Sequence, residues 1–279
     1  MKIGIFTNIH KDSDFSVTKK LAMRLQEGGI EVLLYGDAAK NFNKPDAFLG
    51  KSVPEIMLTL GGDGTILRII SYCAENDIPI LGLNLGNVGF LTGVELSGLD
   101  KLADILKNHR YTIEPCAMLQ IKFPGHEVLA LNDAVIARAA GRMISLDVRV
   151  NGEFVDNYYC DGFIIATPTG STAYSLSAGG PIISPQADVF ALTPVNPHTL
   201  HSRPIIVSGK DVIRIMLAGE TIEGAVVVDG RDVGIFTKGQ VAEICKSKKI
   251  ARFIKTDDKS FFGRLLHKLN KWSVTEKTR

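Results

Sequence analysis

The 279-residue chain has little net charge, no long apolar run and no closely spaced cysteines. No apolar run reaches the roughly 18 residues that a membrane-spanning helix needs, which excludes such a helix. A net charge of +2 is too small to indicate a nucleic-acid partner. The four cysteines are widely scattered without a C-x-x-C pair, which favours free thiols in a reducing compartment over disulfides or a zinc site. Residues 1–8 have no signal-peptide layout, so the expected location is cytoplasmic, with no membrane partner.

Enough apolar residues are present to build a substantial core, since 45% of the chain is hydrophobic and 22% is charged. The length predicts one large domain or two modest ones. Residues 1–110 alternate strand-like and helix-like patterns, which predicts an α/β domain with a parallel sheet flanked by helices. Strands are expected at 1–8, 30–35, 55–59 and 78–83, helices at 17–26, 66–72 and 97–107, and a polar surface loop at 36–52.

The pattern changes after residue 110. Short apolar or alternating runs, separated by Gly, Pro and Asn, follow one another through residues 111–254. They predict a mostly antiparallel, all-β second domain. Asn151-Gly152 is a strong signal for a β-hairpin, and Asp229-Gly230 resembles a second hairpin turn. Apolar residues at helical spacing in the tail, 255–279, predict that it packs back on the first domain rather than on a membrane.

The most informative segment is the glycine-rich loop Gly61–Thr65, which joins a predicted buried strand to a predicted helix. Glycines at such a junction let backbone N–H groups approach a phosphate closely, and the helix N-terminus favours negative charge. Asp63 would repel a phosphate there, unless a divalent cation bridges the two or the carboxylate accepts a proton from an attacking hydroxyl. The combination indicates phosphoryl transfer. The candidate phosphate-binding residues are Gly61, Gly62, Gly64 and Thr65.

A structural alternative exists for the same loop. Gly-Asp-Gly also forms ordinary turns, and Asp63 could simply cap the helix that follows. The position at the carboxyl end of a strand favours a ligand, because open α/β sheets bind their ligands at that edge. The loop is not a Walker A motif, since no Lys follows Gly64, and it lacks the G-x-G-x-x-G spacing of dinucleotide-binding loops.

A second candidate site follows a β-like run in the other half of the chain. Residues 167–172 are dense in hydroxyl groups and lead into a turn and a predicted helix start, where hydroxyls and unpaired N–H groups suit a sugar or a phosphate. Tyr174 offers a flat face for a base or a nicotinamide ring. The structural alternative is that Ser171 caps a short helix and Tyr174 packs in the core.

Three further segments accompany the glycine-rich loop, namely Leu131–Asp133, Asp161–Pro181 and Pro197–Leu200. Together the four segments resemble the NAD kinase family, whose members phosphorylate the 2′-hydroxyl of the adenosine ribose of NAD. The resemblance covers nearly the whole chain, and Asp161–Pro181 is its most specific part. The glycine-rich loop alone is shared with diacylglycerol-kinase-like lipid kinases and resembles the loop of phosphofructokinases.

The resemblance implies ATP-dependent phosphorylation of NAD with Asp63 as the general base. It also implies a divalent cation, Mg²⁺, with the donor phosphates, and a homodimer or homotetramer, but it names no metal ligand. Family members more often have Glu at position 133, and many have Arg at position 159, where this chain has Tyr159. The residues that the resemblance assigns to NAD are Asp63, Gly64, Arg68, Asn132, Asp133, Arg142, Asp161, Thr172, Ala173, Tyr174, Ser175, Leu176 and Ser177.

Two other functions remain open at the level of the sequence. A lipid or small-polyol kinase shares the glycine-rich loop, but no basic amphipathic surface near the N-terminus suggests docking to a membrane. A non-catalytic dinucleotide sensor would bind NAD without transferring phosphate, and the acid at position 63 argues against it. Formation of NADP from ATP and NAD separates these alternatives.

Overall fold

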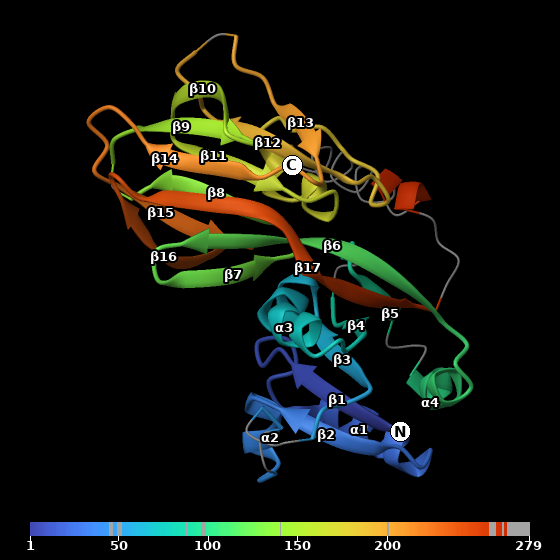
Figure 1. Cartoon of the computed structure of the whole chain (residues 1–279). Coiled ribbons are helices and arrows are strands. Elements are labelled where there is room, and N and C mark those ends of the chain that lie inside the picture. Colours follow the sequence, from blue (N-terminus) through green and yellow to red (C-terminus); the bar gives the residue numbers. More distant parts are fainter. Residues whose placement is uncertain are drawn as a thin grey trace, which may run out of the picture. The chain divides into compact units, whose positions relative to one another are not determined.

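The computed structural model describes residues 1–44, 47–48, 52–86, 89–95, 99–139, 141–199, 201–256, 261–263 and 265–266. The chain divides into two units, the first comprising Met1–Pro115 with Ala251–Arg279 and the second Cys116–Ile250 (Figure 1). Two long strands, β6 (Thr112–Phe123) and β17 (Val241–Lys255), contribute residues to both units.

The first unit contains a parallel sheet with helices on both faces, which confirms the predicted α/β class (Figure 1). The strand order is β2-β1-β3-β4, and β5 and the end of β17 both pair with β4. Its elements are β1 (Lys2–Thr7), α1 (Ser16–Glu27), β2 (Glu31–Tyr35), α2 (Asp37–Asn41), β3 (Ile56–Gly61), α3 (Asp63–Glu75), β4 (Ile80–Asn84), β5 (Thr92–Glu95) and α4 (Leu99–Lys107).

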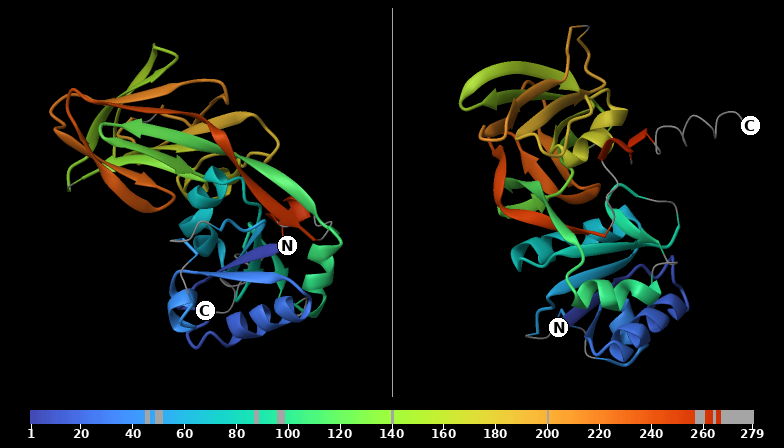
Figure 2. Two further views of the ribbon diagram at one scale, coloured as in Figure 1. Left: turned by 60° about the horizontal axis from the view of Figure 1, so that its bottom comes forward. Right: turned by 90° about the vertical axis from the view of Figure 1, so that its right-hand side faces the viewer.

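Side-chain alternation along β4 explains why both faces of this sheet are covered. Leu81 and Leu83 join a buried cluster that includes apolar residues of α1 and α4, which lie side by side (Figure 2). Gly82 faces the opposite side, where an added Cβ would lie 3.0 Å from the Cδ1 atom of Ile66 on α3. Successive strand residues point to opposite faces, so α1 and α4 cover one side and α3 covers the other.

Two elements of this unit differ from the prediction. The expected surface loop at 36–52 contains the short helix α2, because Ala38 and Ala39 are good helix formers that become buried. The sequence reasoning also missed β5, a four-residue strand that contains Gly93 and shows no apolar alternation. The expected start of the helix at 97–107, where Ser97 would cap it, lies outside the described residues.

The second unit is an antiparallel β domain, as predicted (Figure 1). One sheet has the order β13-β12-β11-β8-β15-β16, and it faces strands β10, β9, β14 and β17 together with the β6–β7 pair. The remaining elements are β7 (His126–Ala130), β8 (Asp133–Arg138), β9 (Ile144–Val150), β10 (Glu153–Cys160), β11 (Gly162–Ala166), η2 (Thr169–Thr172), α5 (Tyr174–Ser177), β12 (Val189–Val195), β13 (Ile205–Ser208), β14 (Ile213–Leu217), β15 (Glu223–Val228) and β16 (Arg231–Thr237).

Both predicted hairpin turns are present. Asn151 and Gly152, with φ angles of 53° and 88°, connect β9 to β10. Asp229 and Gly230, with φ angles of 48° and 75°, connect β15 to β16. Positive φ at both central residues matches the right-handed twist of the strands and favours Asn-Gly and Asp-Gly.

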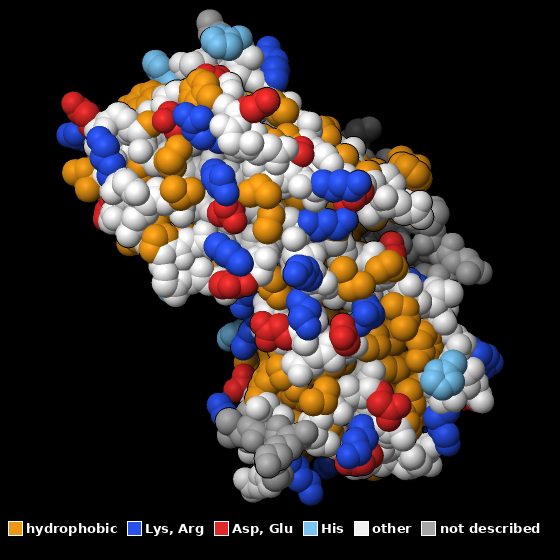
Figure 3. Space-filling view, viewed as in Figure 1, with side chains coloured by type: hydrophobic (Ala, Val, Ile, Leu, Met, Phe, Trp, Pro, Cys, Tyr) orange, Lys and Arg blue, Asp and Glu red, His pale blue; other side chains and the backbone are white. Residues whose placement is uncertain are grey.

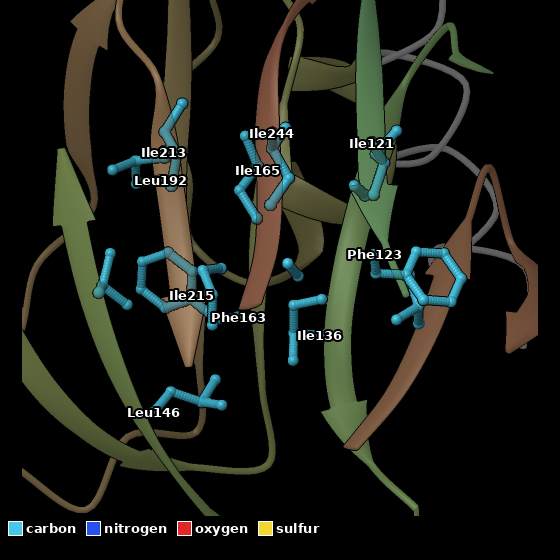
Figure 4. Packing of buried hydrophobic residues seen from close by; sticks show 14 of the residues in the cluster. Ile121, Phe123, Ile136, Leu146, Phe163, Ile165, Leu192, Ile213, Ile215 and Ile244 are labelled. Carbon is cyan, nitrogen blue, oxygen red and sulfur yellow. The ribbon is translucent and has the colours of Figure 1, made fainter. Parts of the chain in front are cut away.

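The core of the second unit lies between its two layers of strands. Figure 4 shows side chains of both layers in contact, among them Phe163 and Ile165 of β11 and Ile215 of β14. The strands alternate buried and more exposed residues where one face meets solvent, as β9 and β14 do, whereas β11 is buried throughout. This core fixes the ends of β8 and β11, from which the second candidate site extends.

Neither the charged surface side chains nor the tail forms a distinct site in the described residues. On the face in Figure 3, Lys and Arg side chains are interspersed with Asp and Glu. None of the helices in the described ranges is both long and apolar enough to span a membrane. In the tail, Leu265 is buried while Phe262 and Leu266 are exposed, and most of the predicted packing of residues 255–279 falls outside the described residues.

Candidate active site

The glycine-rich loop forms the junction between β3 and α3, as predicted. Gly61 ends the strand, Gly62 precedes the helix in an extended conformation and Asp63 begins the helix. A Cβ on Gly61 would lie 2.1 Å from the hydroxyl oxygen of Thr65, so only glycine fits there. Gly62 and Gly64 have no atom within 4 Å of an added Cβ, which leaves space for a ligand to approach the backbone.

The Asp63 carboxylate contacts the segment that follows β4. The N–H of Phe90 donates a hydrogen bond to Oδ2 at 2.8 Å, and the N–H of Leu91 donates to Oδ1 at 3.1 Å. An added Cβ on Gly89 would lie 1.8 Å from Oδ1, so the carboxylate packs directly on that glycine. Asp63 therefore anchors a segment 27 residues further along the chain. Capping of its own helix does not explain these contacts, because Asp63 follows the capping position that Gly62 occupies.

The carboxyl ends of neighbouring strands meet around this loop. Asn8, which follows β1, donates its N–H to the carbonyl of Leu60 at 2.9 Å and its side-chain amide to the Thr65 hydroxyl at 3.3 Å. Thr65 is only 1% exposed, so its hydroxyl lies within this network. The guanidinium of Arg68 lies 5.4 Å from the ring centre of Phe6. The first unit thus places an acid and two open glycines at the edge where α/β sheets bind ligands.

In the second unit, Asn132 and Asp133 lie at the start of β8. The carboxylate of Asp229 accepts hydrogen bonds from three consecutive N–H groups, those of Leu131 (2.9 Å), Asn132 (2.7 Å) and Asp133 (3.2 Å). Sequence reasoning assigned Asp229 only to the hairpin turn and missed this contact. No local signal predicts it, because the bonded residues are 96 to 98 positions apart.

Asp133 and Asp229 are both buried, with 4% and 8% of their surfaces exposed. Burial, and then the neighbouring charge of Asp229, raises the pKa of Asp133 to about 7. Burial also raises the pKa of Asp229, although its three backbone hydrogen bonds act in the opposite direction. Asp133 is therefore partly protonated at neutral pH, and it can both donate and accept hydrogen bonds.

The hydroxyl-rich segment after β11 lies directly against Asn132. The Thr167 N–H donates to the carbonyl of Asn132 at 2.9 Å, and the Thr167 hydroxyl donates to the carbonyl of Leu131 at 2.6 Å. A Cβ on Gly170 would lie 1.9 Å from the Asn132 carbonyl oxygen, so glycine is required there as well. The structure thus brings the second and third motifs together within one unit.

The predicted NAD-contacting residues 172–177 differ in their exposure. Tyr174 is 47% exposed, so the alternative that it packs in the core is wrong. Ser177 is also exposed, while Thr172, Ala173 and Leu176 are half-buried. Ser175 is fully buried and shares a 3.1 Å hydrogen bond with the hydroxyl of Thr193. Ser171 is also buried, and its hydroxyl bonds the Pro168 carbonyl and the Ile183 N–H.

Asp161 lies between β10 and β11 and forms an ion pair with Arg138 at 3.2 Å. The Asn196 side-chain amide also donates to Asp161 at 3.0 Å. Arg138 was not among the predicted site residues. Arg142 is exposed beside an open cavity of about 960 Å³, which Tyr159 also lines. Arg138 connects Asp161 to this cavity, because it also donates to the carbonyl of Gly141, which lines the cavity, at 3.2 Å.

No ready-made metal centre emerges from these residues. Within the described ranges, no three His, Cys, Asp or Glu side chains lie close enough together to hold a metal ion. Mg²⁺ in phosphoryl-transfer sites needs only one or two carboxylates besides the substrate phosphates. The donor set around Asp63 is therefore compatible with a cation that arrives with the phosphates.

Both halves of the chain match one family. Residues 3–111 match the ATP-NAD kinase N-terminal domain, and residues 131–256 match the ATP-NAD kinase C-terminal domain. An NAD kinase from Caldanaerobacter subterraneus is 40% identical over 280 residues, which cover 96% of this chain and 98% of the relative. An NAD kinase from Moorella thermoacetica is 37% identical over 276 residues, covering 96% and 89%.

Solved structures give the same result. The crystal structure of an NAD kinase from Archaeoglobus fulgidus in complex with ATP has a TM-score of 0.75 and 29% identity, covering 97% of this chain and 99% of that one. Yeast NADH kinase complexed with NADH has a TM-score of 0.82 at 24% identity, covering 92% and 84%. The latter similarity concerns the fold alone.

Proposed function

Because this chain belongs to the NAD kinase family and is an enzyme that phosphorylates NAD, we propose that ATP supplies the phosphoryl group and that Asp63 is the general base. Both halves of the chain match ATP-NAD kinase domains, which argues against a lipid or small-polyol kinase and against a non-catalytic sensor. The complex of the Archaeoglobus NAD kinase with ATP supports ATP as the donor.

The orientation of the Asp63 carboxylate is the observation that carries this proposal. Two N–H groups and the Gly89 backbone fix the position of both carboxylate oxygens. A carboxylate offers about four acceptor positions, and these two bonds orient it. The adenosine 2′-hydroxyl gives its proton to Asp63 while its oxygen bonds to the γ-phosphorus. The bond from that phosphorus to the bridging oxygen breaks, and ADP leaves.

The donor phosphates bind the glycine-rich loop in this proposal. The proposed phosphate contacts are Gly61, Gly62, Gly64 and Thr65. Gly62 and Gly64 are the open positions, whereas the Thr65 N–H already donates to the carbonyl of Gly62 at 2.9 Å. The helix N-terminus favours anionic groups. A divalent cation, when bound, neutralises charge that develops on the phosphates. Mg²⁺ is the expected ion, and the donor phosphates would supply most of its protein-independent ligands.

The second unit supplies the main NAD contacts. Tyr174 has an exposed ring that suits stacking, and Asn132 and Asp133 offer an amide and a carboxyl group. Arg142 and Asp161 offer charges of opposite sign. Arg138 lies between them, because it forms an ion pair with Asp161 and donates to the carbonyl of Gly141. The remaining proposed contacts are Thr172, Ala173, Ser175, Leu176 and Ser177, and those of the first unit are Gly64 and Arg68.

Replacement of the acid tests the proposal. Asp63→Asn keeps the size of the side chain but cannot accept the proton, and its NH₂ group faces the N–H of Phe90 or Leu91. NADP formation from ATP and NAD should therefore fall by about a hundredfold or more. Calorimetry should show that NAD still binds. Undiminished turnover in Asp63→Asn would disprove the role of Asp63.

A matched control separates the loss of the base from disturbance of the loop. The Thr92 hydroxyl accepts the N–H of Gly89 at 2.9 Å, in the same segment that Asp63 holds. Thr92→Val removes this bond without changing the carboxylate. We expect its turnover to fall by less than about tenfold, because the general base stays in place.

A further inference from the structure

The Asp229 carboxylate connects two hairpins that are far apart in the sequence. It lies in the β15–β16 turn and accepts the N–H groups of Leu131, Asn132 and Asp133. Its own N–H donates to the carbonyl of Asp133 at 3.0 Å. A hairpin turn needs only residues that tolerate positive φ, so these contacts go beyond the requirements of the turn.

Every backbone polar group of the segment Leu131–Asp133 has a partner. Asp229 pairs its three N–H groups and one carbonyl. Thr167 pairs the other two carbonyls, through its hydroxyl and its N–H. A segment paired in this way has little freedom to move, because any shift would leave a polar group unpaired.

Two side chains of the same segment have unused hydrogen-bonding groups: Asn132 is half-buried, and Asp133 beside it is buried. Across the part of the chain that the structure describes, neither the Asn132 amide nor the Asp133 carboxyl makes a side-chain hydrogen bond. A rigid backbone that carries unused donors and acceptors is typical of a preorganised binding site.

We infer that Asp229 is a positioning residue, whose carboxylate fixes the Leu131–Asp133 backbone so that Asn132 and Asp133 present their side chains to NAD. This inference rests on the proposed function, which gives those two residues to the dinucleotide. Asp229 itself touches only protein in this role. A negative acceptor suits it, because bonds from N–H groups to a carboxylate are stronger than bonds to a neutral oxygen.

Two substitutions weaken the bonds from Asp229 to the Leu131–Asp133 backbone to different extents while keeping the turn. Asn-Gly and Gly-Gly both favour positive φ at the two turn positions, so Asp229→Asn and Asp229→Gly are compatible with the hairpin. Asn retains one acceptor oxygen and places an NH₂ group near a backbone N–H, whereas Gly removes every acceptor. Asp232→Asn is the matched control, because it changes the same charge at an exposed position of the same hairpin.

Steady-state kinetics with ATP and NAD test the inference. We expect the KM for NAD to rise about tenfold in Asp229→Asn, the factor for loss of one good hydrogen bond, and about a hundredfold in Asp229→Gly. The KM for ATP should stay within about twofold in both variants, because the predicted donor site lies in the first unit. Asp232→Asn should match the wild type.

The outcomes are distinct. A KM for NAD in both Asp229 variants equal to that of Asp232→Asn would overturn the inference. Equal increases in KM for both substrates, with reduced resistance to urea, would also overturn it by revealing a general structural role. Activity of the wild type tests the proposed function separately: absence of NADP from wild-type enzyme would refute the function before any variant is compared.

Discussion

Gly89→Ala is the most direct test of how the chain holds its proposed general base. A Cβ at this position would lie 1.8 Å from Oδ1 of Asp63, 2.4 Å from Cγ and 2.7 Å from Oδ2. A Cβ atom does not approach non-bonded atoms this closely, so either the carboxylate or the segment that follows β4 must move. The contacting atoms are the end of a side chain, and rotation of the Asp63 carboxylate away from Phe90 and Leu91 is the easier movement.

The size of the effect follows from the bonds that this rotation breaks. Hydrogen bonds to a charged group contribute roughly 1.5–3 kcal/mol each, and water replaces part of that contribution because Asp63 is only half-buried. We therefore expect the free energy of unfolding to fall by about 2–4 kcal/mol. Turnover should fall by about a hundredfold or more, because the general base loses its orientation.

Steady-state NADP formation and urea unfolding measure the two effects, with Gly86→Ala as the control. Gly86 lies in the same connection, but its Cβ would meet only the Lys11 ammonium at 3.7 Å, an ordinary contact. Gly86→Ala should therefore retain turnover within about threefold. Wild-type turnover in Gly89→Ala would refute the reasoning, since it would mean that the contacts with Asp63 do not set its catalytic orientation.

Two further predictions concern the second unit. The pKa of Asp133 is raised from 3.8 to about 7, so the native state keeps a proton that the unfolded chain loses, and the free energy of unfolding should fall by up to about 4 kcal/mol as pH rises from 4 to 7. Asp133→Asn should remove most of that slope in urea unfolding at several pH values, and an unchanged slope would contradict the assignment to Asp133. Tyr174→Ala should raise the KM for NAD roughly three- to tenfold with little loss of stability, because the ring is exposed. Tyr174→Phe keeps the ring and serves as its control, and equal KM values in the two variants would count against stacking.

Local patterns in the sequence were sufficient for the architecture. The switch from strand–helix alternation to short antiparallel runs predicted the α/β and the antiparallel β fold classes, and the Asn-Gly and Asp-Gly pairs predicted two hairpin turns that the structure contains. The strand–helix junction at Gly61–Thr65 was also predictable, because glycines and apolar runs within one segment define it. Short elements such as α2 and β5 were not, since four or five residues carry too little periodicity.

The contacts that organise the site could not be predicted in the same way. Gly89 and Asp229 act on residues that are distant in the sequence, and neither has a local pattern that identifies its partner. Turn chemistry already explained Asp229-Gly230, so nothing in the dipeptide indicated a second role. The hydroxyl-rich motif likewise does not show which side chains turn inward: Ser175 is buried against Thr193, and its contact with NAD stays a prediction.

The bonds from Phe90 and Leu91 to Asp63 have a consequence for protein engineering. The orientation of the acid depends on residues that enter β5, a strand whose place is set by parallel pairing with β4. Transplanting the five-residue loop into another strand–helix junction would transfer the acid without the amides that aim it. A designed phosphotransferase would therefore need residues 89–95 as well as the loop. It would also need a strand that can pair with residues 92–95 as β4 does here.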